Sequence, residues 1–163
     1  MYTYHYNSPL GGITLASNGN ELTGLWFDGQ RYFCDTLSLE TEEKYLQIFG
    51  QTILWLDIYF SGKVPNFTPP LALLTTPFRK LVWNIMRTIP YGKTMTYGQI
   101  AQMVANQKGI LKMSAQAVGN AVGHNAIALI IPCHRVIGAC GKLTGYAGGI
   151  DKKEALLRLE KIL

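Results

Sequence analysis

A cysteine, a histidine and an arginine are adjacent in the segment Ile131-Pro-Cys-His-Arg135. A cysteine is a strong nucleophile only as its thiolate, and histidine and arginine neighbours are the electropositive surroundings that lower a thiol pKa. Pro132 holds Cys133 away from a regular strand ladder. The segment therefore predicts a nucleophilic Cys133. The alternative is a small apolar cysteine that ends the buried run Ile127–Ile131.

Charge is distributed unevenly along the chain. Residues 1–73 carry three Lys/Arg and seven Asp/Glu, a net −4, whereas residues 74–163 carry twelve and three, a net +9. No acidic side chain occurs between Asp57 and Asp151. A basic field of this kind attracts phosphate backbones and makes binding salt-sensitive. We expect the C-terminal half to bind a polyanion, and a solvated basic surface without a partner is the alternative.

The composition predicts a folded cytoplasmic protein. Hydrophobic residues make up 48% of the 163 residues, yet no apolar run reaches the roughly 18 residues that a membrane helix needs. The first residues lack the features of a signal peptide, and we expect no contact with a membrane. The three cysteines, Cys34, Cys133 and Cys140, fit neither a disulfide framework nor a zinc C-x-x-C pattern. We therefore expect reduced thiols.

The N-terminal half predicts a small sheet followed by a helix. Alternating apolar residues and glycine turns over residues 2–29 indicate two or three antiparallel strands. Thr41, with two glutamates after it, is typical of a helix start, and Ser61-Gly62 is typical of a helix end. Residues 64–70 are rich in proline and form a linker.

Helix-start signals recur in the C-terminal half. Thr76-Pro77 pairs a cap with proline at the first helical position, Thr96 and Gln99 match a capping box, and Ser114 caps a further helix. The last two helices predict a helix-turn-helix. Asp151 followed by Glu154 predicts the cap of a terminal helix.

The second helix of this pair is built from small residues. Residues 114–123 contain almost no long side chain. Such a recognition helix lets its backbone approach a DNA groove closely. Tight packing against a neighbouring helix is the alternative.

Three linked motifs resemble one family. They are Ile131–Gly138, then Leu143–Gly149, then Lys153-Glu154 and Leu156-Leu157 before Glu160. Together they resemble the O6-alkylguanine-DNA alkyltransferases, also called methylated-DNA–protein-cysteine methyltransferases. The resemblance is clear from Thr76 to Leu163, and the N-terminal half is compatible with it.

The resemblance implies a two-domain α+β protein. Residues 1–73 would form a ribonuclease H-like sheet-plus-helix domain with its linker. Residues 74–163 would form a helical, winged-helix-like domain with the helix-turn-helix. This second domain would bind DNA and transfer the alkyl group.

The implied activity is suicide DNA repair. A monomer would bind double-stranded DNA carrying an alkylated guanine through the minor groove and flip that base out. The methyl group of O6-methylguanine would move irreversibly to Cys133, restoring guanine, and O4-methylthymine would be a poorer substrate. Neither a cofactor nor a metal is expected.

The resemblance also implies roles for individual residues. His134 would take the thiol proton through a water, Glu160 would orient His134, and Asn125 would bridge the recognition helix and the active-site strand. Tyr97 would press on the phosphate beside the flipped base. Tyr146 would line the guanine pocket and donate toward the departing oxygen.

Further contacts to DNA and substrate are assigned to four more residues. The backbone around Val136, Ala147 and Gly148 would complete the guanine pocket. Arg135 is placed among the DNA and substrate contacts as well.

One position departs from the family pattern. Where the family usually has an arginine that enters the base stack, this chain has Gln116. Glutamine lacks the charge and the five-donor fork of arginine, so weaker DNA affinity or altered discrimination is expected. The loop Asn106–Lys112 is longer than the family turn, and its lysines, Lys108 and Lys112, would contact phosphates.

Two other functional classes explain parts of this pattern. A cysteine hydrolase would use Cys133 with His124 or His134 and would turn over repeatedly without DNA. A non-catalytic protein that recognises alkylated guanine has another residue at the cysteine position, so Cys133 argues against it. A metal site at Cys133, His134 and Cys140 is not expected, because neighbouring residues of an extended segment point apart and no fourth ligand is evident.

Overall fold

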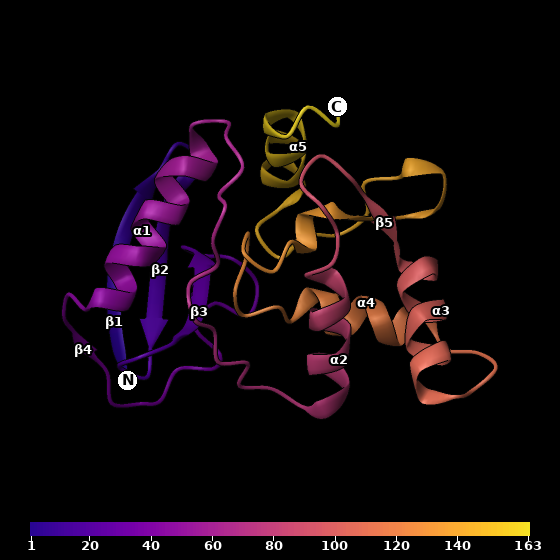
Figure 1. The fold of residues 1–163 in the computed structure, drawn as a ribbon, viewed down its shortest axis with the longest axis horizontal. Coiled ribbons are helices and arrows are strands. Elements are labelled where there is room, and N and C mark those ends of the chain that lie inside the picture. The colour runs from indigo at the N-terminus through magenta and orange to yellow at the C-terminus, as the bar shows by residue number, and fades with distance from the viewer. The chain divides into compact units, whose positions relative to one another are not determined.

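The computed structural model describes residues 1–163, which form two compact units (Figure 1). One unit contains Met1–Leu74 and the short segment Ala126–Ala128. The other contains Thr75–Asn125 and Leu129–Leu163. No helix in either unit combines the length and the apolar character that a membrane crossing requires.

The first unit is built on a four-stranded sheet in the order β3-β2-β1-β4. Its strands are β1 (Tyr2–Ser8), β2 (Gly11–Ser17), β3 (Leu22–Phe27) and β4 (Glu42–Glu43). The first three form an antiparallel meander, as the sequence predicts, and β4 lies parallel to β1. Beside β3, Leu25 exchanges backbone hydrogen bonds with Ala126 and Ala128, so a segment from far along the chain completes this unit.

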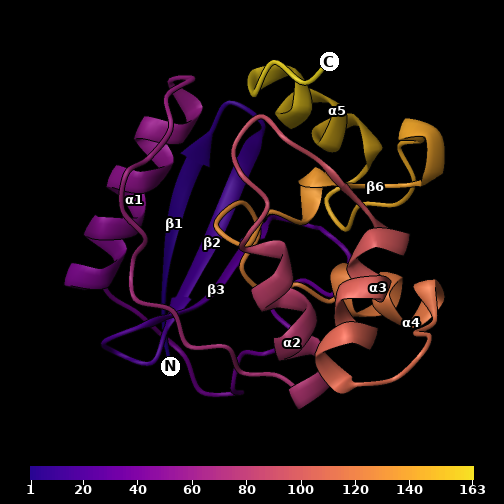
Figure 2. The same ribbon diagram turned by 45° about the vertical axis from the view of Figure 1, so that its right-hand side comes forward.

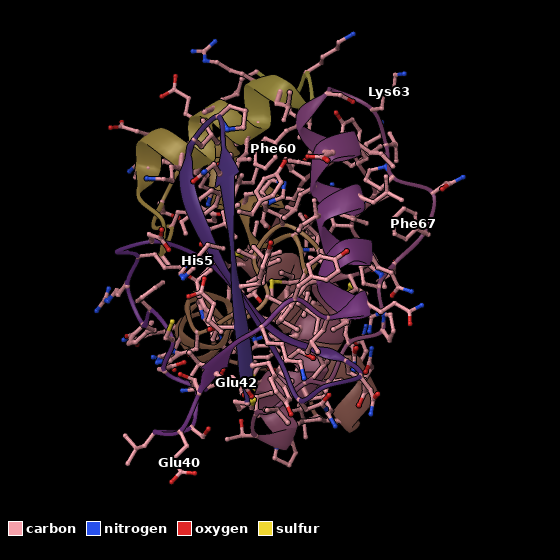
Figure 3. The ribbon with its side chains drawn as sticks, turned by 90° about the vertical axis from the view of Figure 1, so that its left-hand side faces the viewer. His5, Glu40, Glu42, Phe60, Lys63 and Phe67 are labelled. Atoms are coloured by element: carbon pink, nitrogen blue, oxygen red, sulfur yellow. The ribbon has the colours of Figure 1, made fainter.

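Helix α1 (Gln47–Phe60) packs against one face of this sheet (Figure 3). Tyr4 of β1 stacks on Phe49, with ring centroids 5.9 Å apart, and the Tyr6 hydroxyl donates to Asp57 at 2.6 Å. The helix ends as predicted, with Ser61 as C-cap and Gly62 at a φ of 85°.

The predicted start of this helix at Thr41 is wrong. Glu42 and Glu43 form β4, and α1 begins at Gln47 after Leu46, which provides no side-chain cap. Residues 42–43 form a strand because the backbone N–H and C=O groups at the edge of β1 need hydrogen-bond partners. The N–H of Glu42 donates to the Met1 carbonyl, and that of Lys44 donates to the Thr3 carbonyl. Strand pairing therefore outcompetes the local cap signal.

The second unit is mainly helical (Figure 2). Its elements are α2 (Pro77–Met86), β5 (Met95–Thr96), α3 (Tyr97–Lys108), α4 (Ala115–Gly123), the 3₁₀ helix η1 (Cys133–Arg135), β6 (Val136–Ile137), the 3₁₀ helix η2 (Ala139–Gly141) and α5 (Ile150–Leu159). Strands β5 and β6 pair in parallel. Helices α2, α3 and α4 pack on one another, and the buried Trp83 indole donates to the Ala121 carbonyl at 2.9 Å.

The predicted caps of the first three helices are confirmed. Thr76 and Ser114 each accept a backbone N–H three residues on, and Thr96 forms the complete capping box with Gln99. The fourth cap is wrong, because α5 has Gly149 at its N-cap and Asp151 lies inside the first turn. Gly149 adopts a φ of 97°, which a residue with a side chain rarely tolerates.

The apolar run before Cys133 is buried, but it is not a strand. Ile127 makes an isolated bridge to Leu25, and Leu129 then adopts the left-handed region at a φ of 71°. This backbone conformation breaks the ladder, and Pro132 prevents its return. Cys133 therefore starts a 3₁₀ turn rather than ending a strand.

Candidate functional site: a buried thiol beside a histidine–carboxylate–arginine network

Cys133 lies inside the second unit at the start of η1 and is 6% exposed. The strand that follows η1, β6, begins at Val136 and pairs with β5. Pairing with β5 fixes the chain directly after the cysteine. The thiol is therefore held by secondary structure rather than by a free loop.

The resting thiol is protonated. Burial raises the pKa of Cys133 above its usual value, although a hydrogen bond with Asn125, the positive charge of Lys153 and a hydrogen bond with Tyr146 act in the opposite direction. The prediction that the adjacent His134 and Arg135 lower this pKa is therefore wrong. Both side chains are directed to Glu160 instead of to the thiol.

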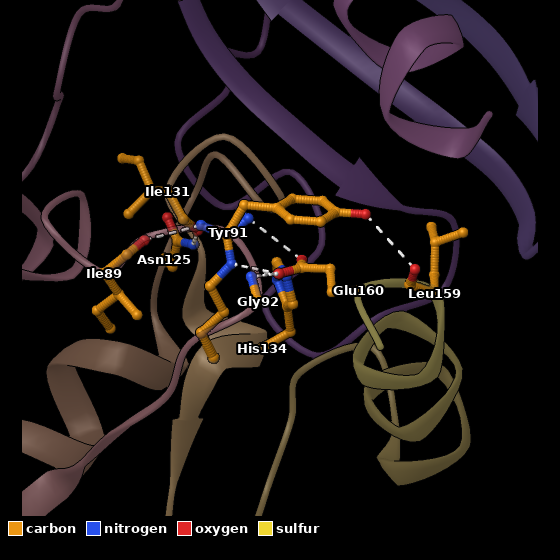
Figure 4. A network of polar contacts seen from close by, with 9 residues as sticks. Ile89, Tyr91, Gly92, Asn125, Ile131, His134, Leu159 and Glu160 are labelled. Atoms are coloured by element: carbon orange, nitrogen blue, oxygen red, sulfur yellow. Dashed lines mark hydrogen bonds and ion pairs between the residues drawn. The ribbon is translucent and has the colours of Figure 1, made fainter. Parts of the chain in front are cut away.

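Glu160 is the centre of a buried polar network (Figure 4). Its Oε2 lies 2.5 Å from His134 Nε2 and accepts from Arg135 at 3.2 Å. Its Oε1 accepts from Arg135 Nε at 2.8 Å and from the Gly92 N–H at 3.0 Å. A buried carboxylate is stable only when its oxygens are paired in this way. The C-terminal end of α5 thus joins the loop after α2 and the cysteine turn.

The network sets the state of His134. Burial lowers the pKa of His134, against the opposing effect of Glu160, so the imidazole is neutral at neutral pH. Because Nε2 faces a carboxylate, Nε2 carries the hydrogen of the neutral ring and donates a hydrogen bond to Glu160. Nδ1 therefore keeps its lone pair and is the nitrogen that can accept a proton.

Arg135 lies in the interior. The residue is 8% exposed, its guanidinium donates to Glu160 and to the Ile89 carbonyl at 2.9 Å, and it lies 5.6 Å from the Tyr91 ring centroid. Placing Arg135 among the DNA contacts does not agree with this position, because a buried guanidinium paired with a carboxylate is not available to a phosphate. Its position instead suggests that it supports Glu160.

Asn125 connects α4 with the cysteine segment. It follows the C-cap of α4, is 4% exposed, and donates from Nδ2 to the Ile131 carbonyl at 2.7 Å. Together with its hydrogen bond to Cys133, this contact places it between the helix and the thiol. The bridging role assigned to Asn125 remains a prediction that this geometry favours.

Lys153 is a further residue at this site, and it was not among the residues predicted from the sequence. Its side chain is fully buried in α5 and donates from Nζ to the carbonyls of Val136 at 2.5 Å, Thr144 at 3.1 Å and Gly145 at 3.2 Å. Burial lowers the pKa of Lys153 to about 8. The signal in the sequence was its helical spacing to the buried Leu156 and Leu157, which puts it on the apolar face of α5.

Lys153 links the segment after η1 to the loop that leads into Tyr146. Val136 directly follows η1, and Thr144 and Gly145 directly precede Tyr146. The three hydrogen bonds of Lys153 thereby fix the backbone of Val136 relative to the thiol. They also fix the loop that continues into Ala147 and Gly148. These are the residues assigned to the guanine pocket, and that assignment remains a prediction.

The remaining predicted residues lie further out in the unit. Tyr97 is half-buried at the start of α3, and its hydroxyl donates to the Thr144 carbonyl at 3.4 Å. His124 has its Nδ1 2.8 Å from the Asn120 carbonyl of α4. Gln116 is exposed on α4.

A shallow groove runs along the exposed side of α4. Its lining residues come from the first turn of α2 and from the N-cap and first two turns of α4, and they are Phe78, Ser114, Gln116, Ala117 and Asn120. Small and uncharged side chains dominate this groove. The predicted recognition helix thus presents a concave, neutral surface.

Comparisons with known protein families cover both units. The model of the 6-O-methylguanine DNA methyltransferase ribonuclease-like domain matches residues 1–73. The model of the DNA-binding domain of the same family matches residues 77–162. No metal-ligating cluster of three or more His, Cys, Asp or Glu side chains occurs in the structure.

Individual relatives match over nearly the whole chain. The methylated-DNA–protein-cysteine methyltransferase of Mycobacterium tuberculosis is 44% identical over 160 residues, covering 96% of this chain and 92% of the relative. That of Methanosarcina acetivorans is 42% identical over 164 residues and covers 98% of both. Among solved structures, the M. tuberculosis OGT protein in complex with DNA superposes with a TM-score of 0.85 at 44% identity, over 99% of this chain and 93% of that one.

These matches confirm the resemblance inferred from the three motifs and the predicted α+β fold class. They extend that resemblance to the N-terminal half, which carried few diagnostic residues. They also set aside the cysteine-hydrolase interpretation. The chain belongs to the methylated-DNA–protein-cysteine methyltransferase family, the 6-O-methylguanine DNA methyltransferases that repair alkylated DNA.

Proposed function

We propose that Cys133 is the methyl acceptor and that it reacts once. The observation that carries this proposal is a buried thiol whose pKa is influenced by Asn125, Lys153 and Tyr146 and that directly precedes His134, which pairs with Glu160. A flipped O6-methylguanine brings its methyl carbon to the sulfur. The thioether that forms is stable, so the protein is consumed in the reaction.

The proton and electron movements balance with these residues and one water. The thiol proton passes through a water to His134 Nδ1, and Glu160 stabilises the resulting imidazolium. The thiolate attacks the methyl carbon, and the bond between this carbon and guanine O6 breaks, leaving its electron pair on the base. Tyr146 donates a hydrogen bond toward O6, which makes guanine a better leaving group. The proton that His134 took from the thiol then returns through water to the guanine anion, so that neutral guanine leaves. The products are S-methylcysteine and guanine.

Lys153 and Asn125 support the transient thiolate. Burial disfavours the charged sulfur, whereas the hydrogen bond from Asn125 and the nearby charge of Lys153 favour it. These groups are in place before the reaction, so they need no reorganisation when charge develops. Thiolate formation is thereby confined to the moment when a substrate occupies the pocket.

Duplex DNA is the partner that fits the second unit. A chain segment without acidic side chains and helix α4 with its small residues favour binding through the minor groove, by a monomer. Tyr97 would then contact the phosphate beside the flipped base. O4-methylthymine would react more slowly than O6-methylguanine, because the pocket is assigned to a guanine.

The test is the mass of the protein after incubation with a duplex that contains one O6-methylguanine. We expect a gain of one methyl group per molecule. Trypsin cleaves after Arg135, so Cys133 and Cys140 fall on different peptides, and the methyl group should appear on the peptide that ends in Cys133-His-Arg. Methylation of the Cys140 peptide instead, or repeated turnover, would contradict the proposal. The Cys140→Ser variant is the matched control and should react like the unmodified chain.

Gln116→Arg is expected to tighten binding to duplex DNA. The new guanidinium would add one positive charge and up to five donors at the exposed groove on α4. We expect about three- to tenfold tighter binding at fixed salt, corresponding to about 1 kcal/mol for one charged contact. Fluorescence anisotropy with a labelled duplex measures the affinity, and Gln102→Arg on α3 is the control for added charge. Equal affinities of the two variants would remove a special role of position 116.

A further inference from the structure

The loop between α3 and α4 carries an apolar tip between two lysines. Helix α3 ends at the left-handed Gly109, and α4 begins after Ser114. Between them, Leu111 is 98% exposed and Ile110 is 44% exposed. Figure 1 shows this loop projecting beyond the end of α3. Lys108 and Lys112 flank the two apolar residues.

This loop is continuous with the groove on α4. Lys108 Nζ lies 5.3 Å from the centroid of the Phe78 ring, and Phe78 lines the groove together with Gln116. Residues 109–113 lead directly into Ser114, which lines the same groove. The tip, the lysines and the groove thus form one surface of the second unit.

The helix itself supplies no charge to this surface. Residues 115–123 contain no Lys, Arg, Asp or Glu, so positive charge beside α4 must come from neighbouring segments: Lys108 and Lys112 on the loop, and Arg79 and Lys80 directly after Phe78. A polyanion that lies along α4 would therefore meet cations on the loop as well as at the start of α2. An apolar side chain between cations is also the composition of a minor-groove wedge, in which the apolar group enters between base steps and the cations face phosphates.

We propose that the loop Gly109–Met113 is a second DNA contact, in which Leu111 inserts into the minor groove beside the damaged nucleotide and Lys112 pairs with a phosphate. This inference rests on the proposed function, because it requires duplex DNA along α4. An exposed leucine gains free energy only when a partner covers it, and base edges and sugars provide an apolar cover in the minor groove. Leu111 thereby eases the unstacking that base flipping requires.

The experiment compares two exposed leucines. Leu111→Ser removes the wedge, and Leu39→Ser changes a leucine of the first unit that is fully exposed and not assigned to DNA. Affinity is measured by anisotropy with a duplex that contains one O6-methylguanine. Burial of a leucine side chain predicts about tenfold weaker binding for Leu111→Ser and less than about twofold change for Leu39→Ser.

Two further readouts separate the wedge from other effects. A 2-aminopurine placed next to the lesion reports unstacking, and its fluorescence gain on binding should fall for Leu111→Ser alone. Lys112→Ala should reduce the slope of log affinity against log salt by about 1.

The outcomes distinguish this inference from the function on which it rests. If the unmodified chain binds the duplex and accepts the methyl group while Leu111→Ser matches Leu39→Ser in affinity, the wedge is wrong and the proposed function stands. A fall of equal size in methyl transfer from free O6-methylguanine base would indicate a damaged site and would also overturn the wedge. If the unmodified chain neither binds nor reacts, both proposals fail.

Discussion

Glu160→Gln is expected to slow methyl transfer by about 100-fold or more, since aligned general acid–base groups contribute about 10²–10⁴-fold to a rate. A neutral amide cannot stabilise the imidazolium that forms when His134 accepts the thiol proton. It also presents an N–H₂ group to the donors of Arg135 or Gly92, one of which loses its acceptor. The fixed orientation of His134 would be lost with it.

The same change should lower the free energy of unfolding by about 3–5 kcal/mol, because it leaves the guanidinium of Arg135 buried without its carboxylate. Urea denaturation measures this loss, and single-turnover rates are compared at a denaturant concentration and temperature at which the variant is folded. Glu154→Gln on the same helix is the control, since its pair with Arg158 is exposed and should contribute less than about 1 kcal/mol. A folded Glu160→Gln protein with the original rate would exclude the orienting role.

Lys153→Met should slow methyl transfer by about tenfold or more, because each unit of rise in the thiol pKa reduces the thiolate population tenfold. Methionine keeps the length of the side chain but removes the positive charge near Cys133 and the three donors to the carbonyls of Val136, Thr144 and Gly145. The loop before Tyr146 would then lose its link to β6. The readout is the pH profile of the single-turnover rate, which should shift to higher pH. Lys152→Met, with the same loss of charge one residue earlier, should keep the original profile.

The Lys153→Met variant should also change the pH dependence of stability. The pKa of Lys153 is about 8 in the folded protein and 10.5 for an ordinary lysine, so between these values the unfolded chain holds a proton that the folded chain lacks. Free energy of unfolding therefore rises with pH across this window because of Lys153. Denaturation midpoints from pH 7 to 10.5 should show the unmodified chain gaining stability relative to Lys153→Met. A constant difference between the two would show that burial does not lower this pKa.

Local signals predicted much of the second unit because its helix starts are encoded within four residues. Thr76, Thr96 and Ser114 cap their helices with their own side chains, so no distant partner is needed to place them. Thr41 shows the limit of this reasoning. Its glutamates pair with β1, and the availability of that strand edge depends on residues 40 positions away.

The motif located the site, but it did not reveal which side chains interact there or how deeply they are buried. Cys133, His134 and Glu160 were expected together, and the structure brings His134 and Glu160 into contact. The depth of burial was not readable, and it reverses the expected direction of the Cys133 pKa shift. Arg135 was expected among the DNA contacts, and Lys153 was given no role at the site. Their partners, Glu160 and three backbone carbonyls, come from other segments, so only the folded chain shows that both are internal.

The protonated, buried state of Cys133 has a consequence for the single reaction that we propose for it. Small electrophiles and oxidants in a cell attack thiolates, and they reach exposed sulfur first. A sulfur that is 6% exposed and held as the neutral thiol is a poor target for them, whereas Cys140 in the same unit is exposed. We therefore expect Cys133 to stay unmodified until a methylated base reaches it, so that the proposed reaction is not lost to side reactions.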